Sequence, residues 1–357
     1  MYRDNILKAN KVMNKLLYLL LIAVCWSCSQ DSETEKHQSK RDQVVDVRDK
    51  MKEFSTQDVL IGRISRTYLI DNYLIVTDYN SPDKLIHLFD KNTFEHLASS
   101  TYQGQGPDEI TIIGHVGIDE TVTGSMQRAI DETNRRFFVS DHGKLKIFAY
   151  DLDSVLTTPE YQPSVKIDMK KKLFPDDYLY LNDTLCIARI IEPVGNNDYK
   201  PSVARWNMAT GEINPMPYEY PDLKKVRFIY AASAEHQLYV QCYTQYDLMT
   251  ICDFNGNLKC NIYGPKWVNE KTQTQHYSLG VEFCGDKILA LYSGGDHRTD
   301  AYYPTKFLVF DLNGNYLKTL ETGYMITDFC YDKENNRLII NLNDEIQFAY
   351  LDLEGII

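Results

Sequence analysis

A loop rich in ionisable and aromatic side chains, "SGGDHRTDAYYPT", is the part of this sequence best equipped for chemistry. Its histidine would change charge near neutral pH, and the neighbouring carboxylates could orient the imidazole for acid–base catalysis. Charged side chains in a long loop can also simply contact a partner, and we predict this second role. The predicted ligand-binding residues of the loop are Asp296, His297, Arg298, Tyr302 and Tyr303.

Two further loops carry residues of the same kinds. The stretch "DHGK" places Asp141 beside His142, and "IEPVGNNDYKP" contains Asn196, Asp198 and Tyr199. We predict that these five residues complete the ligand-binding surface. Acid–base catalysis through a loop histidine stays an alternative role, but the pattern assigns no catalytic residue.

These loops alternate with a repeated unit that ends in a tight turn. The stretch "VFDLNGNYL" joins two apolar runs through Asp, Asn and Gly, which supply side-chain caps and a positive-φ position. Similar stretches recur at intervals of 41 to 61 residues, and two more runs of strand composition precede most of them. One unit therefore comprises four strands. The repeated turns lie at Asp90, Asp151, Asn207, Asp253, Asp311 and Asp352.

Four-stranded units at this period predict an all-β protein, a six-bladed β-propeller. In such a ring, the loops between second and third strands and the connections between blades emerge on one face. The tight turns emerge on the other face. The long loops of this sequence all fall on the first face, which we call the long-loop face. Because binding residues commonly lie on loops that a rigid scaffold positions, we expect the site there.

The last repeated unit lacks an outer strand, because the sequence stops at Ile357 soon after its third strand. An open sheet edge would invite aggregation, so another segment should close the ring. The alternating stretch "QVVDVR", residues 43–48, precedes the first unit and is predicted to supply the missing strand. The propeller is accordingly predicted to span residues 43–357 as a single domain.

The N-terminal segment has the features of an export signal. Residues 1–27 contain an apolar run that is too short for a membrane span but suits a signal peptide. The stretch "CWSC" resembles a bacterial lipoprotein box, which implies cleavage before Cys28 and lipidation of that cysteine. Residues 28–42 are polar and charged, and they are predicted to form the lipidated cysteine and a flexible tether. A plain secretory signal is the alternative.

The blade pattern from Val59 to Ile357 and the stretch "GQGPDEI", Gly104 to Ile110, resemble the six-bladed β-propeller lipoproteins of Bacteroidota, described as TolB-like or NHL-like. Relatives often show Gly-x-Gly-Pro-Gly-Glu after the first blade, and here Asp108 replaces the second-last glycine. The resemblance implies a lipid-anchored protein of the cell envelope, at the outer membrane and either periplasmic or surface-exposed. It supplies no catalytic residue.

Composition excludes some classes of partner. A formal net charge of −12 argues against nucleic acid, whose phosphates require a basic face. No cofactor is predicted, and the six cysteines after Cys28 show no metal-ligand spacing. We expect mostly buried thiols, with a disulfide between Cys252 and Cys260 left open because these residues flank one turn.

Two functions remain from the sequence. The first is non-catalytic recognition of a protein, peptide or glycan through the long-loop face, with the membrane contacted only through the lipid. The alternative is a metal-dependent hydrolase similar to six-bladed lactonases, for which carboxylates such as Asp78 and Asp141 would have to converge on the central channel. We predict the first function.

Overall fold

The computed structural model describes residues 32–56, 59–119, 135–169, 173–195, 198–221, 223 and 226–357. The predictions for residues 1–27, for Cys28 and for Asn196 lie outside these ranges. Within the described residues, no helix is long and apolar enough to cross a membrane.

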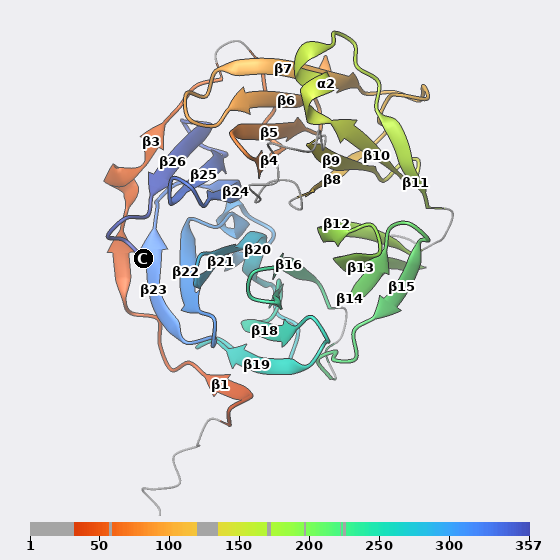
Figure 1. The fold of residues 1–357 in the computed structure, drawn as a ribbon. Helices are drawn as coiled ribbons and strands as arrows, with labels where there is room; N and C mark the ends of the chain where they lie inside the picture. Colours follow the sequence, from red (N-terminus) through yellow and green to blue (C-terminus); the bar gives the residue numbers. More distant parts are fainter. Residues whose placement is uncertain are drawn as a thin grey trace, which may run out of the picture.

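The described strands form six sheets arranged as blades around a ring, which confirms the predicted six-bladed β-propeller (Figure 1). Blade one consists of β4 (Ser65–Ile70), β5 (Tyr73–Asp78), β6 (Lys84–Asp90) and β7 (His96–Tyr102). Blade two consists of β8 (Ile113–Ile118), β9 (Arg136–Asp141), β10 (Lys146–Asp151) and β11 (Ser164–Asp168). Blade three consists of β12 (Phe174–Asn182), β13 (Leu185–Gly195), β14 (Asp198–Asn207) and β15 (Glu212–Pro215).

The remaining blades each recruit an N-terminal strand. Blade four contains β16 (Phe228–Ser233), β17 (Leu238–Tyr243), β18 (Leu248–Asp253), β19 (Leu258–Tyr263) and β1 (Glu35–His37). Blade five contains β20 (Thr274–Cys284), β21 (Lys287–Asp296), β22 (Lys306–Asp311), β23 (Tyr316–Glu321) and β2 (Val44–Asp46). Blade six contains β24 (Ile326–Asp332), β25 (Arg337–Leu342), β26 (Phe348–Asp352) and β3 (Lys52–Glu53).

The first strand of each blade lies nearest the ring axis, and neighbouring inner strands contact one another around a central channel (Figure 1). The hydrophobic core lies between adjacent blades. Leu289 of β21 and Leu338 of β25, for example, belong to one buried cluster shared by blades five and six. The described cysteines, Cys186, Cys242, Cys252, Cys260, Cys284 and Cys330, are free and buried, which confirms the expectation of buried thiols.

The repeated Asp-x-Asn-Gly-Asn turns adopt the same structure in blades four and five. The Asp311 carboxylate accepts hydrogen bonds from the backbone N–H of Asn313 (2.9 Å) and of Asn315 (2.8 Å). Gly314 has a positive φ of 81°, a backbone conformation that residues with a Cβ rarely adopt. Asp253 and Gly256 repeat the arrangement in blade four. The sequence motif thus encodes the reversal between the third and outer strands.

Blade two departs from the predicted tight turn. After β10 the chain forms the helix α2 (Leu152–Thr157), whose N-cap is Asp151. The Asp151 carboxylate accepts a hydrogen bond from the Ser154 backbone N–H at 2.7 Å, as N-cap residues do. The stretch "DLDSVL" provides an N-cap aspartate and lacks the Asn-Gly pair of the other turns, and a helix makes the reversal.

An N-terminal strand closes the ring, but it is not the predicted one. β3 pairs antiparallel with β26 as the outer strand of blade six, with Lys52 opposite Tyr350. The predicted closing strand, residues 43–48, instead contributes β2, which lies parallel to β23 as a fifth strand of blade five. The alternation of "QVVDVR" indicates a strand correctly, but alternation carries no information about which sheet edge accepts it.

The predicted tether is also partly ordered. β1 runs parallel to β19 at the outer edge of blade four, and the chain then follows the rim of the ring to β2 and β3 (Figure 1). Between β1 and β2, the Arg41 side chain is buried and its Nη1 lies 3.0 Å from the buried Asp247 carboxylate. Paired strands and a buried ion pair hold residues 35–53 on the ring, so only what precedes β1 stays a predicted tether.

Candidate functional site

The long loops emerge on the face where each inner strand begins, because connections between blades share that face with the second-to-third-strand loops. They include the β21–β22 loop, the projecting β13–β14 hairpin and the β7–β8 crossover. The predicted ligand-binding residues come from blades two, three and five around this face.

Asp141 holds the loops of blade two in place and is inaccessible to a partner. Its side chain is fully buried, and its carboxylate accepts backbone hydrogen bonds from Thr111, Ile112, Gly143 and Lys144 at 2.9 to 3.1 Å. His142 packs against Phe174, and burial lowers the pKa of its imidazole. Asp141 is predicted to bind a ligand, but in the structure it is a buried carboxylate that holds two loops in place.

The β21–β22 loop presents its predicted residues at the surface. The Arg298 guanidinium makes a two-pronged ion pair with the Asp296 carboxylate, at 2.7 and 3.0 Å, and this pair holds the pKa of Asp296 well below its usual range. His297 Nδ1 lies 2.9 Å from the Gln273 carbonyl oxygen. The rings of Tyr302 and Tyr303 lie 4.2 Å apart. We call these five residues the rim group.

Tyr199 lines a side cavity of about 280 Å³ between blades three and four. The Arg227 guanidinium lies 4.9 Å from the centre of the Tyr199 ring. The side cavity shares Arg189 and Ile229 with a larger cavity in the central channel. The structure thus brings one predicted residue next to the channel, while Asp198 is half-buried and pairs with Gly195 on the same hairpin.

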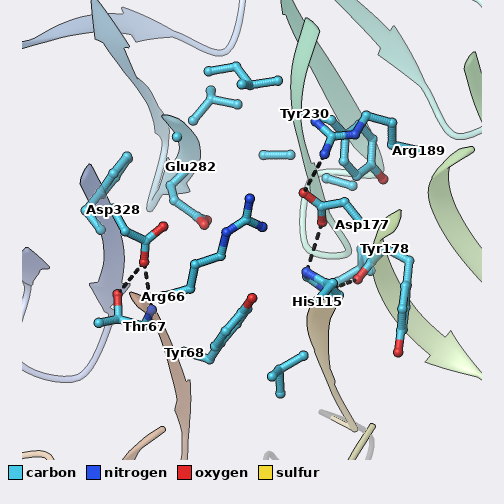
Figure 2. A pocket seen from close by; sticks show the side chains of 18 of the residues that line it. Arg66, Thr67, Tyr68, His115, Asp177, Tyr178, Arg189, Tyr230, Glu282 and Asp328 are labelled. Atoms are coloured by element: carbon cyan, nitrogen blue, oxygen red, sulfur yellow. Dashed lines mark hydrogen bonds and ion pairs between the residues drawn. The ribbon is translucent and has the colours of Figure 1, made fainter. Parts of the chain in front are cut away.

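The channel cavity has a volume of about 380 Å³ and is lined almost entirely by the inner strands. Its ionisable residues lie near the beginnings of β4, β8, β12 and β24, which places them toward the long-loop face, and β20 adds one carboxylate. From the inner strands these residues are Arg66, His115, Asp177, Asp328 and Glu282, and Arg189 of β13 also lines the cavity (Figure 2). Sequence patterning did not select any of these residues.

One side of the channel carries two carboxylates. Asp328 Oδ2 accepts hydrogen bonds from the Thr67 backbone N–H (2.7 Å) and from the Thr67 hydroxyl (2.9 Å). Burial raises the pKa of the Asp328 carboxyl to about 6. Glu282 points from β20 into the channel on the same side of Arg66 (Figure 2).

The opposite side contains a hydrogen-bonded cluster. His115 Nε2 lies 2.9 Å from the Tyr178 carbonyl oxygen, and its Nδ1 lies 3.2 Å from the Asp177 carboxylate. Since both ring nitrogens face acceptors, the His115–Asp177 pair needs a second proton to make both hydrogen bonds, while burial lowers the pKa of His115. Arg189 donates two hydrogen bonds to Asp176, both at 2.9 Å, and a third to the Phe228 carbonyl oxygen.

Arg66 differs from Arg189 in having no bonded partner. Its guanidinium points into the channel between the two sides, and no dashed contact reaches it (Figure 2). Within the described residues it makes no hydrogen bond or ion pair, and the Tyr79, Tyr68, Asp328 and Asp177 side chains act on its charge without bonding to it. The buried Tyr68 hydroxyl, which lines the same cavity, also lacks a hydrogen-bond partner among the described residues.

A sequence signal for this site does exist. The inner strands read as half-buried apolar runs, and "SRTYLI", "FPDDYLYLN" and "ITDFCYD" each place a charged residue near the strand start. In a propeller these positions face one axis, so charges recurring there indicate a channel site. Ionisable residues are more numerous and more varied in the loops, so these strand positions do not stand out in the sequence.

The carboxylates of the channel do not converge as a metal site. Among the described residues, no group of three or more His, Cys, Asp and Glu side chains is placed to hold a metal ion. Asp78, which the hydrolase alternative would recruit, is fully buried and accepts hydrogen bonds from the Gly62 and Asn80 backbone N–H groups.

Comparison with known proteins supports the fold. No family model matches the sequence. No curated protein matches it either. Among solved structures, the chain is similar to a member of the DUF4221 family from Bacteroides vulgatus, with a TM-score of 0.50 and 12% identity over 85% of this chain and 95% of that one.

A second similar structure is described as a luciferin-regenerating enzyme. It has a TM-score of 0.52 and 10% identity, and the similarity covers 84% of this chain and 94% of that one. Because both identities are low, these similarities describe the six-bladed architecture alone. One fold hosts many functions, so the function has to be argued from the channel and its rim.

Proposed function

We propose that this protein is a non-catalytic recognition propeller, tethered to the membrane of a bacterial cell envelope, that binds its ligand at the mouth of the central channel. One observation carries this proposal. Ionisable side chains from inner strands of five different blades surround a cavity of about 380 Å³, and four of them lie near the strand starts, toward the face where the long loops emerge. Ligand sites are commonly concave, with a few convergent polar groups, and this cavity has both properties.

The long loops extend the binding surface. The side cavity continues from the channel through Arg189 toward Tyr199 and Arg227. The rim group offers an arginine, a histidine and two tyrosines, which suit contact with a protein, peptide or glycan. The buried channel groups would then select one end of the ligand, while the rim group would contact the part that remains outside.

Recognition without catalysis suits the chemistry of the channel. Arg189 and Asp176 hold each other, Asp177 faces His115, and Asp328 is held by Thr67. Arg66 and Tyr68 are donors without a bonded partner among the residues that the structure describes, and such groups orient a ligand. A catalytic role would require a nucleophile or base beside a bound substrate, and we assign none.

The tether forms the second part of the proposal. Cys28, in the lipoprotein-like stretch "CWSC", would carry the lipid. β1 begins at Glu35 on the outer edge of blade four, so six residues, and seven steps from one Cα to the next, would join the anchor to the ring. An extended chain spans at most about 3.6 Å per residue, so the ring would stay within roughly 25 Å of the membrane surface.

Affinity capture with matched variants tests the binding site. Wild type, Arg66→Gln and the control Arg63→Gln would be immobilised and exposed to envelope extract. Arg63 is exposed and does not line the cavity. We expect wild type and Arg63→Gln to retain the same molecules and Arg66→Gln to lose them. Retention of one set by all three proteins contradicts a channel site, and metal-dependent turnover of a lactone or phosphoester contradicts the non-catalytic role.

The anchor is tested separately. Replacing Cys28 with Ala should move the protein from the detergent phase to the aqueous phase, and the native N-terminus should carry an acyl mass. An unchanged partition together with an unmodified Cys28 contradicts the lipid anchor and leaves the channel site unaffected.

A further inference from the structure

We propose that the channel cavity binds a small zwitterion, that is, a free amino acid or short peptide that carries both a carboxylate and an ammonium group. This inference rests on the proposed function, because it names the ligand class of the same site. The cavity combines two donors that have no bonded partner among the described residues, carboxylates around those donors, and a volume that suits a small molecule.

Arg66 supplies the site for the carboxylate. Its guanidinium points into the cavity and makes no hydrogen bond or ion pair within the described residues (Figure 2). A guanidinium presents N–H donors in a planar fork that matches two carboxylate oxygens. Arg189 shows this two-pronged geometry with Asp176 in the same channel. A ligand carboxylate would give Arg66 the partner that the protein gives Arg189.

Tyr68 lies beside that position and supplies a second donor. Its hydroxyl is buried and lacks a hydrogen-bond partner among the described residues. A buried polar group without a partner is costly, so such groups commonly mark a place that a ligand or water fills. Tyr68 is two residues from Arg66 on β4, and both side chains line the cavity (Figure 2).

The surrounding carboxylates select against ligands with a single charge. Asp328 and Glu282 lie on one side of Arg66, and Asp177 lies on the other (Figure 2). A ligand that carried only negative charge would meet these carboxylates as it approached Arg66. A ligand that carried only positive charge would meet Arg66. A zwitterion places its carboxylate on Arg66 and directs its ammonium toward a carboxylate, so both charges are satisfied.

The cavity size agrees with this class of ligand. A volume of about 380 Å³ is near the lower end for small-molecule sites. The side cavity that continues through Arg189 offers room for a second residue of a peptide. Its aromatic and cationic residues, Tyr199 and Arg227, would contact that second residue.

Isothermal titration calorimetry on the full chain would test the inference. The probes are the free amino acids and a set of dipeptides, together with two derivatives of each. The N-acetyl derivative lacks the ammonium group, and the C-terminal amide lacks the carboxylate. We expect at least one amino acid or dipeptide to bind, and each of its derivatives to bind roughly ten- to a hundred-fold more weakly, as expected for loss of a charge-assisted hydrogen bond.

Variants would assign the binding to Arg66. Arg66→Gln should abolish binding of the zwitterion, and Arg63→Gln should leave it unchanged. Arg66→Lys keeps the positive charge but loses the planar fork, so it should bind the zwitterion roughly tenfold more weakly than wild type. This variant provides the test if Arg66→Gln folds poorly. Thermal unfolding of each variant would verify that the protein is folded.

The possible failures can be told apart. If no amino acid or dipeptide binds, or if a derivative with one charge binds as tightly as its parent, the zwitterion inference is wrong. If an extract component is still captured through Arg66, the proposed function stands without it. If neither probes nor extract components depend on Arg66, both proposals fail.

Discussion

An aspartate at the end of a propeller strand can contact a ligand or hold neighbouring loops in place, and Asp141 has the second role. At the end of β9 it sits where a propeller site could begin, and its position beside a histidine suggests chemistry. The structure uses both its oxygens to bind backbone N–H groups of two loops. Asp78 does the same with the N–H groups of Gly62 and Asn80, and one oxygen of Asp247 accepts from the Lys266 N–H while the other pairs with Arg41. Carboxylates at these positions tie neighbouring segments together.

Replacing Asp141 with Ala should therefore destabilise the fold. Four backbone donors would lose a charged acceptor, and we expect the free energy of unfolding to fall by about 3 kcal/mol or more. Asp296→Ala is the matched control, because its side chain is 37% exposed and its partners among the described residues are Arg298 and His297 of its own loop. Urea denaturation of both variants would measure the difference. Equal stability of the two would contradict the structural role of Asp141.

Asp328 should make stability depend on pH. Its pKa is raised to about 6 by burial, while the unfolded chain titrates near its ordinary value. Between those values the folded protein holds a proton that the unfolded chain has lost, so the Asp328 contribution to stability declines as pH rises from about 4 to 6. The full change is roughly 3 kcal/mol.

The variant Asp328→Asn isolates this contribution, because its amide oxygen can still accept the hydrogen bonds from Thr67. The stability of wild type minus that of the variant should decline between pH 4 and pH 7. Denaturant unfolding across this range measures it, and a constant difference would show that Asp328 does not titrate there.

At the scale of elements, residues 35–53 of the N-terminal segment lie along the outer edge of the ring. β1 and β2 are three residues each and pair with only one neighbour, so their own hydrogen bonds stabilise them little. Arg41 lies between them, and its buried side chain attaches this segment to the ring. Its guanidinium pairs with Asp247 and donates to the Tyr277 hydroxyl at 3.0 Å.

Arg41→Ala should destabilise the protein by about 3 to 5 kcal/mol, because it leaves the buried Asp247 carboxylate without its cation. The neighbouring Lys40→Ala should change little, since Lys40 is exposed. Adding Asp247→Asn to Arg41→Ala should recover part of the loss by removing the unpaired charge. Chemical denaturation of the four proteins forms the test, and no recovery in the double variant would contradict this account.

An element can be predicted from the sequence when the residues that determine it are close together in the chain. The blades and the Asp-x-Asn-Gly-Asn turns are local, so periodicity and turn residues indicate them. The assignment of β3 to β26 is not local, since a two-residue strand has no period and its partner lies about 300 residues away. Arg66 falls between these cases, because its charge is visible in the sequence but its lack of a partner is a property of the assembled channel.

At the scale of the whole molecule, closure by β3 should make the ring unfold as one unit. Phe54 follows β3, stacks on Phe94 of blade one at 3.7 Å between ring centres, and contacts Phe348 of blade six. This residue therefore connects the first blade to the last. Without it and β3, blades one and six would still meet through their inner strands, their shared core and the ion pair between Lys91 and Asp332.

Deleting residues 1–54 should lower stability by several kcal/mol and replace one unfolding transition with a broader one. Deleting residues 1–40 removes β1 and leaves Arg41, β2 and β3, so it should have a much smaller effect. Calorimetry of both truncations measures this. Equal melting temperatures would show that the inner strands alone close the ring.

The position of β3 also has a consequence for the order in which the protein can be made. The strand that completes blade six lies near the start of the chain, and its partner β26 ends at Asp352, close to Ile357. A ribosome therefore has to make all six blades through β26 before β3 can pair with its partner. Until then blade one has no neighbour on one flank. Substitutions at Phe54 or β3 should reduce the yield of newly made protein more than they shorten the lifetime of finished molecules, because long-range contacts form late.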